Sequence, residues 1–216
     1  MKKVVNKMTE QNKDWTGNTS IYACNHRTKE EDVSENDLYC THPESIQLFF
    51  KKCAERGFEI PIKIWEPCCG LGSISDELIK IGCDVLSTDL IDRGYGEGNI
   101  DFLKLKKETL RPEWKDYMKC IVTNPPYKYA QECVEKALEL LDDDGICIMF
   151  LKTTFLETKG RLKLFKNHKL KYVWQYVNRQ GCGKNTRVFK NGGAAAYAMF
   201  IWDKSYNGLP EIDWIE

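Results

Sequence analysis

The apolar and polar positions of the chain alternate between helical and strand patterns after a polar beginning. Residues 1–36 show neither period, which predicts an irregular N-terminal arm or tail. Apolar residues then recur at helical spacing, and Gly57 marks a stop, so we predict a helix over 43–57. The later predicted strands are 60–65, 83–89, 120–124, 146–152, 170–177 and 194–203, and the predicted helices are 75–82, 113–119, 129–145 and 161–169.

This order of elements predicts an α/β fold. Strands that alternate with helices form a mostly parallel sheet covered on both faces. The last two predicted strands follow each other without a clear helix between them, so we expect an antiparallel hairpin at one edge. We assign the sheet to one domain over residues 37–216. In open sheets of this kind, ligands bind outside the carboxyl ends of the strands.

Length and composition are those of a globular protein. The chain has 216 residues, of which 42% are hydrophobic and 30% are charged, enough for one domain with a sizeable core. No apolar run approaches the length that spans a membrane, so no membrane partner is expected. The N-terminal sequence has no apolar signal core, and we therefore expect a cytoplasmic location.

The ten cysteines form no Cys-x-x-Cys pair and are expected to be buried free thiols in a reducing compartment. Two short motifs, Cys24-Asn-His26 and Cys40-Thr-His42, together hold the ligand set of a structural zinc. Their internal spacing of one residue is tighter than that of known zinc motifs, so ordinary loop residues are favoured and no metal is expected.

The formal net charge is zero, but one segment is strongly basic. The range 158–193 contains ten Lys or Arg and no Asp or Glu. Basic residues interleaved with aromatic ones suit phosphate contact and base stacking; the alternative is a solvated face whose aromatics turn inward. The interleaved aromatics are Phe165, Tyr172, Trp174, Tyr176 and Phe189, and the candidate nucleic-acid contacts in the glycine-punctuated loop are Arg179, Lys184 and Arg187.

A glycine turn between a strand and a helix predicts a nucleotide-like ligand. In Glu66-Pro67-Cys68-Cys69-Gly70-Leu71-Gly72-Ser73, the two glycines permit a tight turn and a close backbone approach. Asp89 ends the next strand, where an acid accepts hydrogen bonds from ribose hydroxyls. The missing third glycine and acidic Glu66 argue against a diphosphate. S-adenosylmethionine, which carries a sulfonium and an amino group but no phosphate, fits better.

Two further patterns follow along the chain. In "GNIDFL", Asp101 could accept from an adenine amino group and Phe102 could cover the ring; alternatively they are a polar loop residue and a core aromatic. In "CIVTNPPY", the strand ends at Asn124 because Pro125 and Pro126 have no N–H to donate. An amide and an aromatic ring, Tyr127, therefore flank a stiff turn at the carboxyl end of a strand.

In this order, "EPCCGLG", "STD", "IDFL" and "TNPPY" resemble the motifs of class I S-adenosylmethionine-dependent amino-methyltransferases. "NDLYCTHP" is similar to their N-terminal cofactor motif in the gamma arrangement, with His42 as an extra residue. Other phrases resemble small phage and prophage adenine-specific DNA methyltransferases. The resemblance implies a Rossmann-like three-layer sandwich with a seven-stranded sheet. It also implies S-adenosylmethionine contacts from Tyr39, Thr41, Glu66, Pro67, Gly70, Gly72, Asp89, Asp101, Phe102 and Asn124.

The same resemblance implies catalysis by Asn124, Pro125, Pro126 and Tyr127. The side-chain oxygen of Asn124 and the carbonyl of Pro125 would accept hydrogen bonds from the target amine, and Tyr127 would stack on a flipped base. The leading hypothesis is methylation of adenine in DNA. The alternatives are an RNA or protein-glutamine substrate and a non-catalytic nucleic-acid-binding module. Only 89 residues follow Tyr127, which leaves no room there for a separate target-recognition domain.

Overall fold

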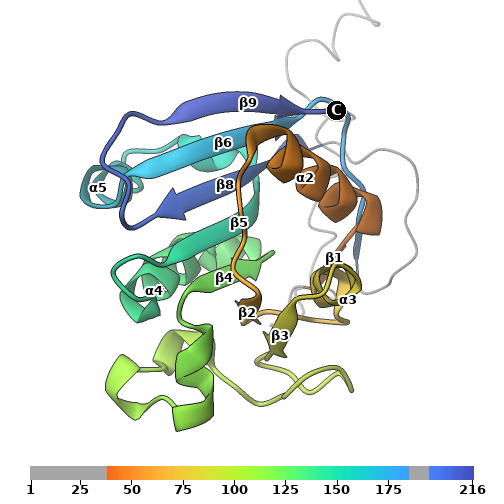
Figure 1. Ribbon diagram of the computed structural model, residues 1–216, viewed down its shortest axis with the longest axis vertical. Coiled ribbons are helices and arrows are strands. Elements are labelled where there is room, and N and C mark those ends of the chain that lie inside the picture. The colour runs from red at the N-terminus through yellow and green to blue at the C-terminus, as the bar shows by residue number, and fades with distance from the viewer. Residues whose placement is uncertain (1–37, 185–194) are drawn as a thin grey trace, which may run out of the picture. The chain divides into compact units, whose positions relative to one another are not determined.

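The computed structural model describes residues 38–184 and 195–216, all within the unit Asn36–Glu216 (Figure 1). Residues 1–37 and 185–194 lie outside the described residues. The expectations for the N-terminal arm, Cys24, His26, Arg187 and Phe189 therefore stay predictions, as does the domain boundary near residue 36.

A seven-stranded sheet forms the centre of the described structure. Its strands are β2 (Lys63–Glu66), β3 (Asp84–Ser87), β4 (Cys120–Thr123), β5 (Ile146–Lys152), β6 (Leu170–Tyr176), β8 (Tyr197–Asp203) and β9 (Glu211–Ile215). They lie in the order β3-β2-β4-β5-β8-β6-β9. The first four are parallel, β8 is antiparallel to both β5 and β6, and β9 is parallel to β6. The expected mostly parallel sheet with an antiparallel hairpin is confirmed.

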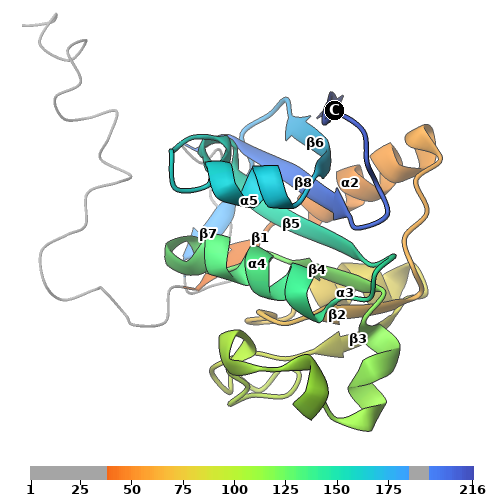
Figure 2. The ribbon, with the colours of Figure 1, turned by 90° about the vertical axis from the view of Figure 1, so that its left-hand side faces the viewer.

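Helices cover both faces of this sheet, which confirms the three layers. The helices are α2 (Pro43–Arg56), α3 (Ser73–Lys80), α4 (Ala130–Leu140) and α5 (Leu162–Asn167). α2 and α3 lie on one face, and α4 and α5 lie on the other (Figures 1 and 2). Phe49 of α2 packs on Trp174 of β6, whereas Val134 of α4 belongs to the opposite core with Trp65 of β2. Each core thus excludes water from one side of the sheet.

The ends of α2 show how local sequence sets an element. His42 is the N-cap, where its Nδ1 accepts a hydrogen bond from the backbone N–H of Glu44 at 3.2 Å. Pro43 follows at the first helical position, where a missing N–H costs nothing. Gly57 ends the helix with a φ of 59°, a left-handed conformation that glycine adopts without strain.

Three strands were not predicted. β1 (Tyr39–Thr41) and β7 (Cys182–Lys184) form a separate two-stranded antiparallel ribbon, with Tyr39 opposite Lys184. β9 forms the outer edge of the sheet beside the hairpin. The predicted helix over 113–119 is instead one of several 3₁₀ helices, which span Phe102–Lys104, Lys107–Thr109, Pro112–Tyr117, Tyr127–Tyr129 and Thr153–Leu156.

Candidate active site

The glycine turn between β2 and α3 is tightly packed by the chain itself. Gly70 and Gly72 have φ values of 56° and 78°, which side chains rarely adopt. A Cβ on Gly70 would lie 2.6 Å from Leu38 Cδ1, and one on Gly72 would lie 2.1 Å from Tyr95 Cζ. The missing side chains therefore admit Leu38 and Tyr95 in this structure. It stays a prediction that Gly70 and Gly72 also leave space for a ligand. The expected contact between Pro67 and S-adenosylmethionine stays a prediction as well.

Asp89 ties the carboxyl end of β3 to this turn. Its Oδ2 accepts a hydrogen bond from the backbone N–H of Gly70 at 2.8 Å. Its Oδ1 accepts from the N–H of Ile91 at 2.9 Å and from the guanidinium of Arg93 at 2.5 Å. The side chain is buried, so these donors compensate the loss of water. The acid expected at the ribose position is thus held rigidly beside the glycine turn.

Glu66 ends β2 and is almost fully buried. Its Oε2 accepts from the backbone N–H of Ser75 at 2.8 Å and also from the Ser75 hydroxyl. Burial outweighs these hydrogen bonds and raises the pKa of the carboxyl group to about 8. At neutral pH the group is then mostly protonated, so it repels a diphosphate far less than the sequence analysis assumed. The charge of Glu66 therefore does not exclude a diphosphate ligand.

Asn124 is held by β1 across the carboxyl end of β4. Its Nδ2 donates to the carbonyl oxygen of Tyr39 at 3.1 Å and to Thr41 Oγ1 at 3.0 Å. A carbonyl oxygen only accepts, so the amide nitrogen must face β1. Oδ1 then points elsewhere, is buried, and has no hydrogen-bond partner among the described residues. The structure thus brings Tyr39 and Thr41 to Asn124 and leaves an acceptor there without a described partner, whereas the cofactor contacts expected of these residues stay predictions.

Tyr127 lies in a cluster of polar aromatic residues. Its ring centroid is 4.8 Å from that of Tyr39, and its hydroxyl is 2.7 Å from the hydroxyl of Tyr197. Lys152 Nζ lies 4.2 Å from the Tyr127 ring centroid. Tyr197 and Lys152 are direct cross-strand partners on β8 and β5. Sequence reasoning missed both, although Lys152 is the one charged residue of an apolar strand and ends it.

Pro125 is buried and Pro126 is half-buried between these groups. The carbonyl of Pro126 accepts from the N–H of Tyr129 at 2.9 Å and so begins the 3₁₀ helix Tyr127–Tyr129. The strand therefore turns directly into a short helix after the prolines. The role of the Pro125 carbonyl as a second acceptor stays a prediction.

Asp101 and Phe102 follow a segment that runs beside the end of β3, where the N–H of Ile100 donates to the Asp89 carbonyl at 2.9 Å. Asp101 forms an ion pair with Lys104 at 2.8 Å. The Phe102 ring is buried and packs edge-on against Trp65, with centroids 5.3 Å apart. Phe102 is thus a core aromatic, the alternative expectation for this residue, and its packing gives no support to stacking on an adenine.

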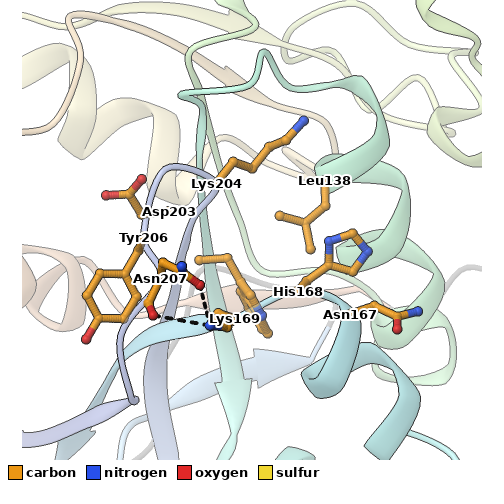
Figure 3. A pocket seen from close by; sticks show the side chains of 9 residues that line it. Leu138, Asn167, His168, Lys169, Asp203, Lys204, Tyr206 and Asn207 are labelled. Atoms are coloured by element: carbon orange, nitrogen blue, oxygen red, sulfur yellow. Dashed lines mark hydrogen bonds between the residues drawn. The ribbon is translucent and has the colours of Figure 1, made fainter.

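The basic segment does not form one stripe. Trp174 and Tyr176 are buried in the core, so the interleaved aromatics expected to stack on bases turn inward at these positions. Lys171, at the amino end of β6, pairs with Asp203 at 2.8 Å. Lys169 lines a cavity of about 240 Å³, and its Nζ donates to the carbonyl of Asn207 at 3.2 Å (Figure 3). Both lysines lie at the end of the sheet opposite Asn124, because β6 is parallel to β4 and β5.

The structure describes the three candidate nucleic-acid contacts to different extents. Arg179 is exposed in the loop after the carboxyl end of β6, on the same side of the sheet as Asn124. The backbone of Lys184 pairs with Tyr39 through the β1–β7 ribbon. Arg187 lies outside the described residues. Contact between these residues and nucleic acid stays a prediction.

Within the described ranges, no three His, Cys, Asp or Glu side chains gather as a metal site. His42 caps α2 instead, and Cys40 is buried. Burial raises the pKa of Cys53 and of Cys69 to about 12, as expected of inert buried thiols. None of the described helices is long and apolar enough to cross a membrane.

Comparison with protein-family models and with curated proteins finds no match to the sequence. Solved structures do share the fold. A candidate hemolysin from Lactococcus lactis has a TM-score of 0.55 at 11% identity, covering 79% of this chain and 92% of its own. A candidate RNA methyltransferase from Pyrococcus horikoshii has a TM-score of 0.54 at 12% identity, covering 85% and 95%.

A third structure, a candidate class I S-adenosylmethionine-dependent methyltransferase from Listeria monocytogenes, has a TM-score of 0.53 at 13% identity, covering 89% of this chain and 69% of its own. At such identities the likeness concerns the arrangement of elements and not the side chains of a site. The chain therefore has the Rossmann-like fold found in class I methyltransferases.

Proposed function

We propose that this protein transfers a methyl group from S-adenosylmethionine to the exocyclic amino group of adenine in DNA. The observation that carries the proposal is the state of Asn124. Its amide nitrogen is engaged by Tyr39 and Thr41, while its buried oxygen has no partner among the described residues. A buried acceptor without a partner is costly unless a ligand donates to it. An exocyclic amine is a ligand that supplies such a donor.

The residues at the carboxyl ends of β2 and β3 fit the proposed cofactor. Two acidic side chains, Glu66 and Asp89, converge on the glycine turn through Ser75 and Gly70. Asp89 would accept from the ribose hydroxyls, and Glu66 would face the cationic part of the ligand. The remaining expected contacts with S-adenosylmethionine in this region would come from Tyr39, Thr41 and Asp101. When bound, S-adenosylmethionine supplies an activated methyl group, so no strong base is needed from the protein.

The chain itself would supply alignment and acceptors. An aromatic amine is a poor nucleophile, because its lone pair is delocalised into the ring. The Asn124 oxygen and the Pro125 carbonyl would accept from its two hydrogens and favour a pyramidal nitrogen. The cluster around Tyr127 would hold the planar base in one orientation, which is the larger part of such catalysis. A base in a duplex must flip out to reach these groups.

The test is to incubate the purified protein with labelled S-adenosylmethionine and, separately, unmethylated DNA, RNA and a glutamine-containing peptide. Digestion and nucleoside analysis then locate the label. We expect label on the adenine amino group of DNA. Label only in RNA or peptide would replace the substrate by one of the alternatives. The absence of transfer to all three, with nucleic-acid binding retained, would favour the non-catalytic module.

Asn124→Ala should lower the rate of methyl transfer at least about 100-fold, because an acceptor aimed at the reacting amine is lost. Cofactor affinity measured by calorimetry should change by less than about threefold if the acidic side chains dominate binding. Asn167→Ala is the matched control, since Asn167 is exposed at the far end of the sheet. Thermal unfolding should show that both variants remain folded. Retained transfer in the Asn124 variant would contradict its role.

A further inference from the structure

Lys152 is a cation inside the site that the proposed chemistry does not use. It is the last residue of β5, half-buried, and its Nζ lies 4.2 Å from the Tyr127 ring centroid. Within the described part of the chain it forms no ion pair. By contrast, Lys119 and Lys171, at the opposite end of the sheet, pair with Asp144 and Asp203.

The position of Lys152 is fixed by the sheet. Its backbone pairs with Tyr197, whose hydroxyl bonds to that of Tyr127. The ammonium therefore lies over the aromatic ring that would receive the target base. A cation 4.2 Å from the centroid occupies the space of a stacked ring on that face. A base that enters this face must displace the ammonium, which then needs a new partner close by.

The proposed substrates differ in what they offer to that cation. A nucleotide that flips into the site carries phosphate groups, and lysine binds phosphate as a point charge. A glutamine side chain brings an amide and no phosphate. Resting on the proposed function, we propose that Lys152 leaves the Tyr127 ring when the base enters and binds the backbone phosphate of the target nucleotide. It is thus a specificity residue that selects nucleic acid over peptide.

The experiment compares the full-length wild type with Lys152→Gln and Lys152→Arg. The substrates are a single-stranded oligonucleotide with one adenine and the same oligonucleotide with neutral methylphosphonate links on both sides of that adenine. Fluorescence anisotropy gives Kd, and labelled methyl transfer gives kcat and KM. Lys169→Gln is the matched control, since Lys169 lies at the opposite end of the sheet.

We expect Lys152→Gln to raise Kd and KM for the natural oligonucleotide roughly tenfold, with kcat changed less, because one phosphate contact is lost. Its slope of log affinity against log salt should fall by about 0.7, the value for one contact on a single strand. The neutral links should weaken wild-type binding similarly and have little further effect on the variant. Lys152→Arg should restore binding to within about threefold, because the charge is kept.

Three results would overturn the inference. In the first, the wild type binds the two oligonucleotides with equal Kd, whether or not it methylates them. In the second, Lys152→Gln leaves Kd, KM and the salt slope unchanged. In the third, the variant loses affinity for S-adenosylmethionine and not for DNA, which would assign the cation to the cofactor carboxylate. If the proposed function itself is wrong, the wild type will transfer no methyl group to DNA. That result is distinct from the three results above, which concern binding and the effect of Lys152→Gln.

Discussion

Glu66 is a carboxyl group whose ionisation differs between the folded and the unfolded chain. Burial raises its pKa from an ordinary value near 4.5 to about 8, so the folded protein binds a proton that the unfolded chain releases. The contribution of this carboxyl to stability is complete below pH 4.5 and is lost as the pH rises to about 8. A cationic ligand beside Glu66 would favour the carboxylate and release that proton.

Glu66→Gln should therefore stabilise the protein increasingly with pH. A glutamine can still accept from Ser75 but never has to ionise. We expect the free energy of unfolding of the variant to exceed that of the wild type by roughly 3–5 kcal/mol above pH 8, and the difference to shrink towards pH 4.5. Urea unfolding at several pH values measures this.

Glu77→Gln is a control of opposite sign. Burial opposes ionisation of Glu77, but hydrogen bonds from Lys80 and Gln47 outweigh it and lower the pKa. Its contribution to stability is present above the unfolded pKa and is lost as the pH falls. The variant should therefore be less stable than the wild type at neutral pH, with a gap that closes in acid. If both variants showed the same pH trend, the assignment for Glu66 would be wrong.

At the scale of elements, α2 depends on a cap that sequence reasoning considered as a zinc ligand. The Nδ1 atom of His42 satisfies the N–H of Glu44, one of the donors that the first turn leaves without a helical partner. Thr41, whose Oγ1 accepts a hydrogen bond from Asn124, immediately precedes this cap in the sequence. The start of α2 is therefore adjacent in sequence to a residue of the candidate site.

His42→Ala should lower the free energy of unfolding by about 1 kcal/mol, because this acceptor is lost. His42→Asp should restore most of it, since aspartate is a preferred N-cap and its charge is favourable at a helix N-terminus. Denaturant unfolding of the three proteins gives the comparison. Adding zinc provides a further check: a strong zinc-dependent rise in stability that both variants lose would support the metal interpretation instead.

At the scale of the whole molecule, the last strand joins regions that are distant in sequence. β9 pairs with β6, and Asp213 forms ion pairs with Lys52 and Arg56 of α2. Residues along β9 alternate between the two sides of the sheet. Ile215 is 2% exposed and belongs to the core under α2, whereas Ile212 is 61% exposed. This difference allows a matched test of how much the strand contributes.

Ile215→Ala should lower the free energy of unfolding by about 2–4 kcal/mol, because the deletion leaves a cavity in the core. Ile212→Ala, the same change on the exposed side, should alter it by less than about 0.5 kcal/mol. Thermal and urea unfolding report both values. Equal effects would show that β9 is not packed as described.

Strands that local sequence defines were predictable, whereas strands that depend on pairing with distant segments were not. The strands 120–124 and 146–152 were predictable because they are apolar runs with turn residues or charges at their ends. β1 and β7 were not, because each has three residues and exists only through pairing with the other. β9 was missed because two of its large apolar residues face solvent at the edge, so its pattern did not resemble a buried strand.

The positions of Asp89, Asn124 and Tyr127 just after the carboxyl ends of β3 and β4 were predictable from local motifs, whereas their roles stay predictions. The site was not predictable where chemistry depends on contacts between strands. Lys152 and Tyr197 reach Tyr127 only through the register of β5 and β8. The aromatics of β6 were misjudged for a related reason, since neighbouring helices decide whether an aromatic on a strand faces a ligand or the core.

The β1–β7 ribbon also determines when the site can exist during synthesis. β1 leaves the ribosome early, but its partner strand comes from the far end of the chain. The hydrogen bond between Ser45 and Gln180, 135 positions apart, closes the same long loop. Closing a long loop lowers the entropy of the chain before native contacts compensate for that loss. We therefore expect these contacts to form late in folding. A nascent chain therefore contains Asn124 long before it contains β7, the partner of the strand that contacts Asn124, so the candidate site can form only after residues 182–184 have been synthesised.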